Sequence, residues 1–138
     1  MRVVVETPRW SLVKYRRVEG GFVKEFTSPL PTFFNYGFVE GTEGADGMPR
    51  DSIVLGSRLR QGASVEVKQA GVVKFVDDGR EDDKLVTSSD GLVNPAERIS
   101  IHLFFTTYML FKTVYYLLRE GRITRCRYGG FTPLPSVV

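Results

Sequence analysis

The chain has 138 residues, of which 42% are hydrophobic and 25% are charged, and its 19 basic and 16 acidic residues give a formal net charge of +3. This length fits one domain with a single core over residues 1–138, and the composition is that of a folded chain rather than a disordered one. The single cysteine, Cys126, excludes an internal disulfide and a cysteine-based zinc site, and it fits a reducing, cytoplasmic compartment. The small excess of positive charge permits an anionic partner without requiring one.

Short strands are expected through most of the first 89 residues. The apolar run at the N-terminus is broken by Glu6 and Pro8, so it predicts a strand and not a signal peptide. Gly20 and Gly21 predict the turn of a hairpin. Residues 28–42 are rich in proline and aromatic residues and are expected to form a connection. The predicted strands are residues 2–8, 12–26 as a hairpin, 51–57, 63–79 and 84–89.

One long helix is expected from Pro95 to about Glu120, with Asn94 before it and Gly121 after it. Residues 99–118 are apolar on nearly every side but contain Lys112, and a lysine at the centre of a bilayer costs about 3 kcal/mol. We therefore expect a core helix and no membrane span, with the protein's own strands on one side and a partner on the other.

A last strand is expected at residues 122–128, where basic and apolar residues alternate. Many short strands followed by one helix predict a mainly β fold, a small antiparallel barrel with the helix packed outside.

Seven acidic residues fall in two turns, DGMPRD at 46–51 and DDGREDDK at 77–84. If the two turns face each other, their carboxylates form an oxygen-only site of the kind that selects Mg²⁺ or Mn²⁺. The alternative is that both turns are simply solvated. Met48 lies in the middle of the first turn, and its thioether is a poor ligand for a hard cation and accepts no proton at neutral pH.

The segments FNYGFVEGT…ADGMPRD and GVVKFVDDGREDDKLV resemble the soluble family I inorganic pyrophosphatases. That family's pattern is N-Y-G-[FY], then D-G-D-P-x-D, then D-x₄-D-x-K after G-V-x-K. Three further segments fit the family. VVVETP resembles its glutamate strand, KY at 14–15 resembles its lysine strand, and YYLLREGR resembles the end of its C-terminal helix. The similarity covers roughly residues 3–131. It implies a five-stranded OB-like barrel with one long flanking helix, in a divergent, shortened member that lacks the family's N-terminal extension and final helix.

The resemblance also implies Mg²⁺-dependent hydrolysis of pyrophosphate to two phosphates, with Mn²⁺ as a substitute ion. The metal ligands that it implies are Asp46, Asp51, Asp77, Asp82 and Glu6. The phosphate-binding residues that it implies are Lys14, Tyr36, Lys84 and Tyr115.

Several positions depart from the family pattern. Met48 replaces the aspartate that acts as general base, and Asp77 is the first candidate for a substitute base. Since general-base catalysis typically contributes 10²–10⁴-fold, we expect weak activity. The remaining departures are Arg16 in place of a glutamate, Lys24 or Glu25 at the phosphate-binding arginine, and Tyr116 at the lysine that follows the helix tyrosine.

These departures leave two functions open. The first is a weakly active pyrophosphatase, as a homo-oligomer. The second is a non-catalytic relative that serves as a structural or binding component of a larger assembly, for example a ribonucleoprotein. In the second case an RNA-binding ridge would consist of Arg119, Arg122, Arg125 and Arg127.

Overall fold

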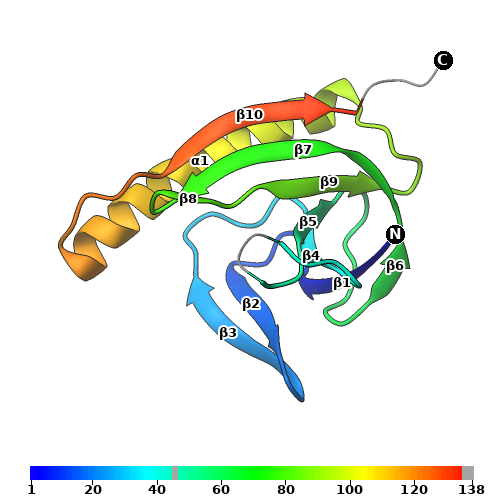
Figure 1. Cartoon of the computed structure of the whole chain (residues 1–138), viewed down its shortest axis with the longest axis horizontal. Coiled ribbons are helices and arrows are strands. Elements are labelled where there is room, and N and C mark those ends of the chain that lie inside the picture. Colours follow the sequence, from blue (N-terminus) through cyan, green and yellow to red (C-terminus); the bar gives the residue numbers. More distant parts are fainter. Residues whose placement is uncertain (45–46, 135–138) are drawn as a thin grey trace.

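A computed structural model of the chain describes residues 1–44 and 47–134. It shows a mainly β protein with one long helix in the described part, as the sequence predicted (Figure 1). In chain order, the elements are β1 (Arg2–Thr7), β2 (Val13–Val18), β3 (Gly21–Thr27), β4 (Asn35–Val39), β5 (Asp51–Val54), β6 (Ser64–Glu66), β7 (Lys68–Asp77), β8 (Arg80–Glu81), β9 (Lys84–Ser88), α1 (Pro95–Glu120) and β10 (Arg127–Pro133).

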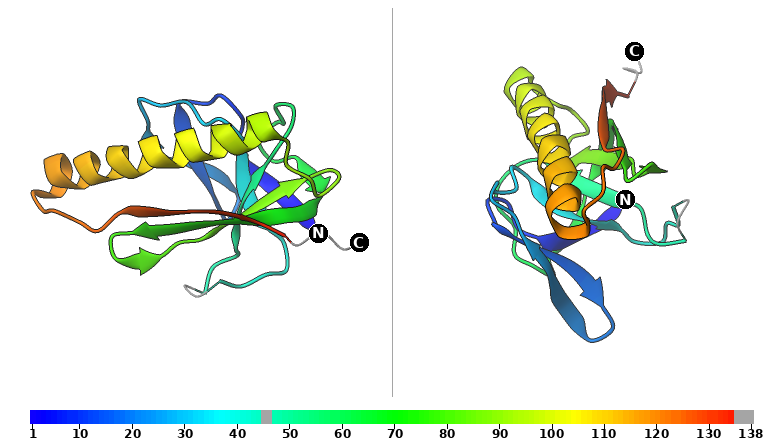
Figure 2. Two further views of the ribbon diagram at one scale, coloured as in Figure 1. Left: turned by 90° about the horizontal axis from the view of Figure 1, so that it is seen from above. Right: turned by 90° about the vertical axis from the view of Figure 1, so that its left-hand side faces the viewer.

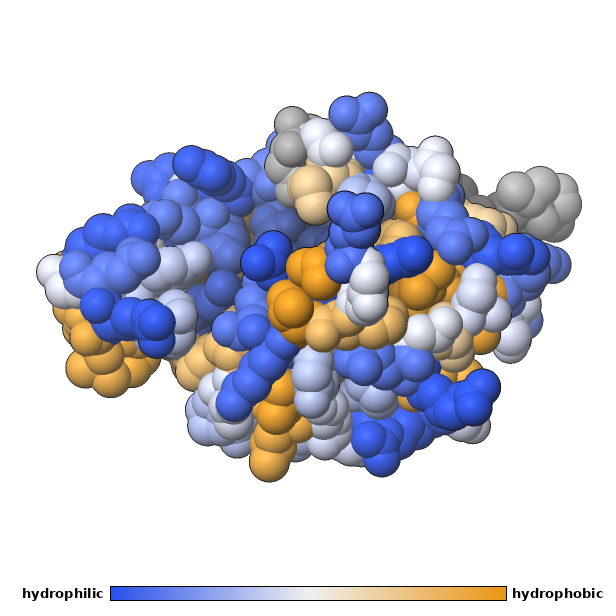
Figure 3. Space-filling view, turned by 90° about the horizontal axis from the view of Figure 1, so that it is seen from below, coloured by the Kyte–Doolittle hydropathy of each residue, from blue (hydrophilic) through white to orange (hydrophobic). Residues whose placement is uncertain are grey.

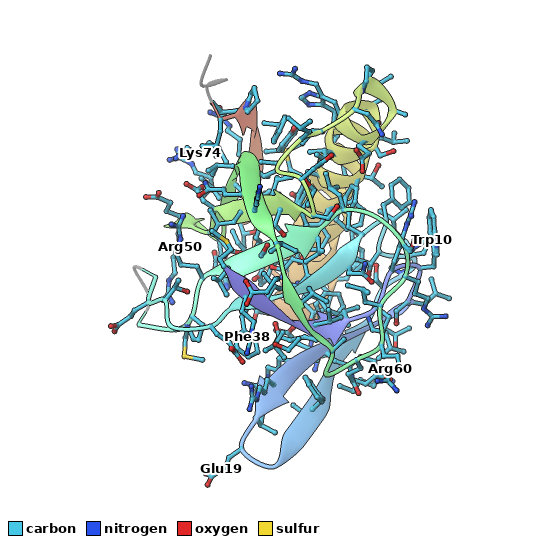
Figure 4. All side chains as sticks on the ribbon, turned by 90° about the vertical axis from the view of Figure 1, so that its right-hand side faces the viewer. Trp10, Glu19, Phe38, Arg50, Arg60 and Lys74 are labelled. Carbon is cyan, nitrogen blue, oxygen red and sulfur yellow. The ribbon has the colours of Figure 1, made fainter. Side chains whose placement is uncertain are left out.

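The main sheet runs in the order β10-β7-β9-β5-β4-β1-β6, and β8 pairs with β7. Neighbouring strands are antiparallel, except that β5 and β9 are parallel. β2 and β3 form a separate hairpin that stands away from this sheet, with Glu19 at its tip (Figures 1 and 4).

The sheet curls but does not close into the five-stranded barrel that was predicted. β7 has ten residues and is paired with β9 on one side and with β10 on the other. In the described strand order β10 and β6 are the two ends of the open sheet, although only Val67 separates β6 from β7 along the chain.

The predicted strand 63–79 is divided into β6 and β7, the short β8 was not predicted, and β4 and β10 differ most from the prediction. β4 lies in the middle of the sheet, within the segment predicted to be a connection. Its Gly37 is needed for close packing, since a Cβ there would lie 2.0 Å from the carbonyl oxygen of Val4. The last strand, β10, begins five residues later than predicted. It continues through two glycines, which accommodate a register shift between Tyr128 and Gly130 against β7.

The helix has the bounds that were predicted. It begins with a capping box, in which the Asn94 side chain accepts from the Glu97 amide and the Glu97 carboxylate accepts from the Asn94 amide. It ends at Gly121, which adopts the left-handed conformation with φ 66°.

The helix lies across one face of the sheet, and its C-terminal end extends beyond the strands (Figure 2). The buried residues of this face are Ile101, Phe104, Phe105 and Tyr108, and they pack with Ile53, Val73, Phe75 and Val86 of the sheet. Among the described residues, no helix is both long enough and apolar enough to cross a bilayer.

Candidate functional site

A cleft of about 1210 Å³ lies between the β2–β3 hairpin, the sheet and the helix. The hairpin lines the cleft on one side. Asp77 at the end of β7 and Lys112 on α1 line it on the other side. In Figure 3 the surface is hollowed between the hairpin in the centre and the lobe at the left, and mostly hydrophilic side chains surround the hollow.

Lys84 lies at the floor of this cleft between two aspartates. Because β5 and β9 are parallel neighbours with Ser52 opposite Leu85, the residues just before them, Asp51 and Lys84, lie side by side. The Lys84 Nζ atom is 2.8 Å from a carboxylate oxygen of Asp51 and 2.8 Å from one of Asp82. Burial of Lys84 favours the neutral amine, but the two carboxylates outweigh it and raise the pKa of Lys84.

Tyr36 and Lys14 form the adjoining part of the floor. Two ammonium groups lie close to the Tyr36 ring, with Lys14 Nζ 4.7 Å and Lys84 Nζ 5.5 Å from its centroid. Burial, together with the charges of Asp51 and Asp82, raises the pKa of Tyr36 well above its usual range. The Tyr36 hydroxyl therefore stays protonated and remains a hydrogen-bond donor.

Tyr108 brings the helix to the same floor. Its hydroxyl accepts a hydrogen bond from Lys14 Nζ at 3.1 Å, and burial raises the pKa of Tyr108 to about 12. One turn further along the helix, Lys112 also lines the cleft.

The second acidic turn pairs each of its aspartates with a basic residue. Asp78 and Gly79 form the two-residue loop between β7 and β8, with φ of 53° and 78°, the left-handed values that an Asp-Gly hairpin turn requires. The four ion pairs are Asp77 with Lys112 at 3.2 Å, Asp78 with Arg122 at 2.8 Å, Asp82 with Lys84 at 2.8 Å and Asp83 with Lys74 at 2.8 Å.

Glu6 is a carboxylate of the cleft without a basic partner among the described ion pairs. It is 8% exposed and accepts a hydrogen bond of 2.7 Å from the Arg17 amide. Burial is the main reason that the pKa of Glu6 is raised, the amide offsets part of this effect, and the charge of Asp51 adds to it.

The first acidic turn contributes Met48, which is 60% exposed and lines the cleft. Asp46 lies outside the described residues. Within the described residues, no group of three or more His, Cys, Asp or Glu side chains is placed to hold a metal ion. Asp51 and Asp82 nevertheless converge on one ammonium, so their oxygens surround a position that already holds a positive charge. This pair fits Mg²⁺, which proteins usually bind through one or two carboxylates together with phosphate oxygens.

Most of the residues that the resemblance singled out lie in the same cleft. The structure brings together Glu6, Lys14, Tyr36, Asp51, Asp77, Asp82 and Lys84. It also places Arg16 and Glu25 in the lining, whereas Lys24 is not part of it.

Tyr115 is not among the residues that line the cleft. Its ring instead packs against Phe26 and Phe111, with centroids 6.0 Å and 5.9 Å away. The helix contributes Tyr108 and Lys112 to the lining, and neither was singled out from the sequence. Their spacing from the buried Phe104, four and eight residues, places them on the buried face, and this signal was available in the sequence.

Comparison with known protein families shows to which family the chain belongs. The family model described as inorganic pyrophosphatase matches residues 3–115. The inorganic pyrophosphatase of Sulfolobus acidocaldarius is 33% identical over 101 residues, which are 70% of this chain and 58% of that protein. The inorganic pyrophosphatase of Gluconobacter oxydans is 31% identical over 100 residues, 69% of this chain and 58% of that protein. The chain belongs to the inorganic pyrophosphatase family, and it spans 58% of the length of these two relatives.

Solved structures agree on the fold. The inorganic pyrophosphatase of Helicobacter pylori superimposes with a TM-score of 0.78 at 24% identity, covering 97% of this chain and 84% of that one. The inorganic pyrophosphatase of Thermus thermophilus gives a TM-score of 0.79 at 22% identity, covering 96% of this chain and 82% of that one. These similarities establish that the chain has the OB-like pyrophosphatase fold, with its sheet left open.

Proposed function

We propose that this protein binds pyrophosphate and phosphate in the cleft together with Mg²⁺ or Mn²⁺, and that it hydrolyses pyrophosphate slowly. The observation that carries the proposal is the convergence of Asp51 and Asp82 on Lys84, at 2.8 Å each, on the floor of a large hydrophilic cleft. The names of the relatives support the choice of pyrophosphate as the substrate.

The residues that would hold the cation are Asp51 and Asp82, with Asp46 as a further ligand from outside the described residues. When bound there, a divalent cation would polarise phosphoryl oxygens and lower the pKa of water. Glu6 lies in the same cleft and would add negative charge close to Asp51; burial, and to a lesser extent the charge of Asp51, raise the pKa of Glu6.

The residues that would hold phosphate oxygens are those that can donate hydrogen bonds from the cleft floor. Lys14 and Lys84 carry positive charge, and Tyr36 and Tyr108 keep their protons because burial raises their pKa values. Such preorganised donors stabilise the charge that develops as a phosphate leaves. The helix hydroxyl best placed for this role is that of Tyr108, since Tyr115 lies outside the lining.

Slow hydrolysis follows from the lack of a suitable proton acceptor. Met48 occupies the position of the base in the family pattern, and its thioether does not accept a proton. Asp77, the candidate substitute, already uses one oxygen for Tyr116 and the other for Lys112. Because both oxygens of Asp77 are engaged by the protein, neither is free to take a proton from water, and Asp77 replaces the missing group poorly.

A calorimetric titration with Mn²⁺ tests the cation site. We expect binding that Asp51→Asn and Asp82→Asn weaken, because each removes a charge from the converging pair. Asp83→Asn is the matched control, since Asp83 belongs to the same turn but pairs with the exposed Lys74. Absence of binding by the unaltered protein at millimolar Mn²⁺ would refute the site.

A second candidate is a non-catalytic pyrophosphatase-like protein that acts in a larger assembly of the cytoplasm. The observation that favours it is the exposed apolar face of the helix. Leu103, Leu110 and Leu117 recur every seven residues along this face and are 57%, 58% and 48% exposed. An exposed apolar stripe of this kind usually marks an interface.

A homo-oligomer is the simpler partner for this face, and light scattering decides whether it forms. We expect a dimer or larger species at tens of micromolar, which Leu110→Lys converts to a monomer. A monomer in the unaltered protein would exclude self-association. RNA binding by the arginine ridge gains little support, because Arg122 is already paired with Asp78 and Glu120.

A further inference from the structure

Lys112 is a basic residue of the cleft to which the family pattern assigns no function. It lies in the second half of α1, its side chain is 12% exposed, and it faces the cleft that also contains Lys84 and Asp77. A lysine is seldom buried to this extent unless its charge has a partner. Its partner is the Asp77 carboxylate, 3.2 Å from Nζ.

The ammonium of Lys112 is only partly engaged by the protein. It has three hydrogen-bond donors, and in the described part of the chain Asp77 supplies its one ion pair. The other neighbours of Nζ are aromatic rings: Phe26 at 5.5 Å, Tyr108 at 5.8 Å, Tyr115 at 6.0 Å and Tyr116 at 5.3 Å. These contacts are to the faces of the rings, and the hydrogen bonds of the described residues include none from Lys112 to a tyrosine hydroxyl. Donors therefore remain for an anion that enters the cleft.

Asp77 is, by contrast, fully engaged. One of its oxygens accepts from the Tyr116 hydroxyl at 3.0 Å, and the other faces Lys112. A divalent ion at Asp77 would have to displace an ammonium that the surrounding rings hold in place. The Asp77 charge is balanced one for one by Lys112, whereas Asp51 and Asp82 share a single ammonium and keep a net negative charge, so Asp77 is the poorer ligand for a metal.

We propose that Lys112 is a resident cation of the cleft, which takes the place of a divalent ion at Asp77 and presents its remaining donors to a phosphate oxygen. The statement about phosphate rests on the proposed function, whereas the statement about Asp77 concerns this chain's own ion pair. An ammonium carries a single charge and, unlike a metal ion, needs no set of ligands in a fixed coordination geometry. It would therefore hold a phosphate on this side of the cleft in the absence of metal.

The first experiment counts bound Mn²⁺ by electron paramagnetic resonance in the presence of phosphate. We expect Asp77→Asn to leave the count unchanged and Lys112→Met to add one ion per chain, which the double variant with Asp77→Asn loses again. Lys112→Arg keeps the positive charge and should add none. If Asp77→Asn alone loses an ion, or if Lys112→Met adds none, the replacement of metal by Lys112 is wrong.

The second experiment measures binding of inorganic phosphate by calorimetry in EDTA, where metal makes no contribution. We expect Lys112→Met to weaken binding about tenfold or more, as loss of a charge-assisted hydrogen bond does. Lys112→Arg should retain most of the affinity, and Lys74→Met, which removes an exposed lysine outside the cleft lining, should have no effect. Equal affinity in Lys112→Met and the unaltered protein would show that Lys112 serves only the ion pair.

The two possible failures are distinguishable. If the unaltered protein binds neither Mn²⁺ nor phosphate, the proposed function fails. If it binds both but loses an ion in Asp77→Asn, the proposed function stands and the role of Lys112 is wrong.

Discussion

The two acidic turns that border the cleft differ in how far basic side chains compensate their negative charge. In the turn between β7 and β9, each of the four aspartates has a carboxylate oxygen 3.2 Å or less from the side-chain nitrogen of a basic residue. In the turn before β5, Asp51 shares Lys84 with the other turn, and Met48 is an exposed methionine. Arg50, next to Asp51 in the chain, lies on the same side of the molecule as Lys74 in Figure 4 and is not part of the cleft lining.

This difference indicates where an external cation is needed. The β7–β9 turn is nearly neutralised by the protein itself, and its cations come from four places in the chain: β7, β9, the helix and the segment after the helix. The turn before β5 brings no cation of its own into the cleft among the described residues. A divalent ion therefore has most to offer beside Asp51, where the two turns meet.

Removal of the Lys84 ammonium, which Asp51 and Asp82 share, should give the largest change in stability. Lys84→Met leaves Asp51 and Asp82 facing each other, and loss of one partner from a buried ion pair typically costs 3–5 kcal/mol. Because both aspartates are 34% exposed, we expect about 2–3 kcal/mol in the free energy of unfolding by urea. Added Mn²⁺ should restore part of this loss. Lys74→Met, which breaks an exposed pair of the same turn, should cost much less, and equal losses in the two variants would contradict the comparison.

A smaller and opposite change is expected at Glu6, a buried carboxylate without a basic partner among the described ion pairs. Since burial raises the pKa of Glu6 above its value in the unfolded chain, its contribution to stability is present at low pH and is lost as the pH rises through the folded-state pKa. Glu6→Gln should therefore raise the melting temperature at pH 7, by roughly 3 °C for a domain of this size. At pH 4 the two proteins should have the same melting temperature. A lower melting temperature of Glu6→Gln at pH 7 would show that the fold stabilises the charge of Glu6.

The smallest change is expected at the tip of the β7–β8 hairpin. Arg122 is exposed and holds Asp78 through two hydrogen bonds of 2.8 Å, which lower the pKa of Asp78. Exposed ion pairs contribute little and are screened by salt. Arg122→Gln should therefore leave the melting temperature in 0.5 M NaCl unchanged within error. A clear loss at that salt concentration would mean that this pair is more than a surface contact.

Much of the fold could be predicted from the sequence, because local signals agreed with it. Asn94, Pro95 and Gly121 mark the ends of the helix, and the described structure has those ends. β4 was missed because Gly37 read as part of a loop, whereas its lack of a side chain is what lets β4 approach β1. The open sheet was missed because the pairing of strands far apart in the sequence decides whether a sheet closes, and no local pattern encodes such pairing.

The candidate site could be predicted only as far as the motifs reach. Asp51, Asp82 and Lys84 lie in contact, as their positions in the two turns suggested. The assignment of roles to them stays a prediction. Lys112 was considered only as a charge inside an apolar helix, since its pairing with Asp77 depends on how the helix crosses β7.

Phosphate release from pyrophosphate with Mg²⁺, compared between the unaltered protein and Met48→Asp, shows whether the missing base limits hydrolysis. We expect slow release by the unaltered protein and an increase of roughly 10²-fold in the variant, at the lower end of what a general base contributes. Asp51→Asn in the Met48→Asp background should abolish the gain. Fast release by the unaltered protein, or no gain from Met48→Asp in a folded variant that binds Mn²⁺, would contradict the proposal that the missing base limits hydrolysis.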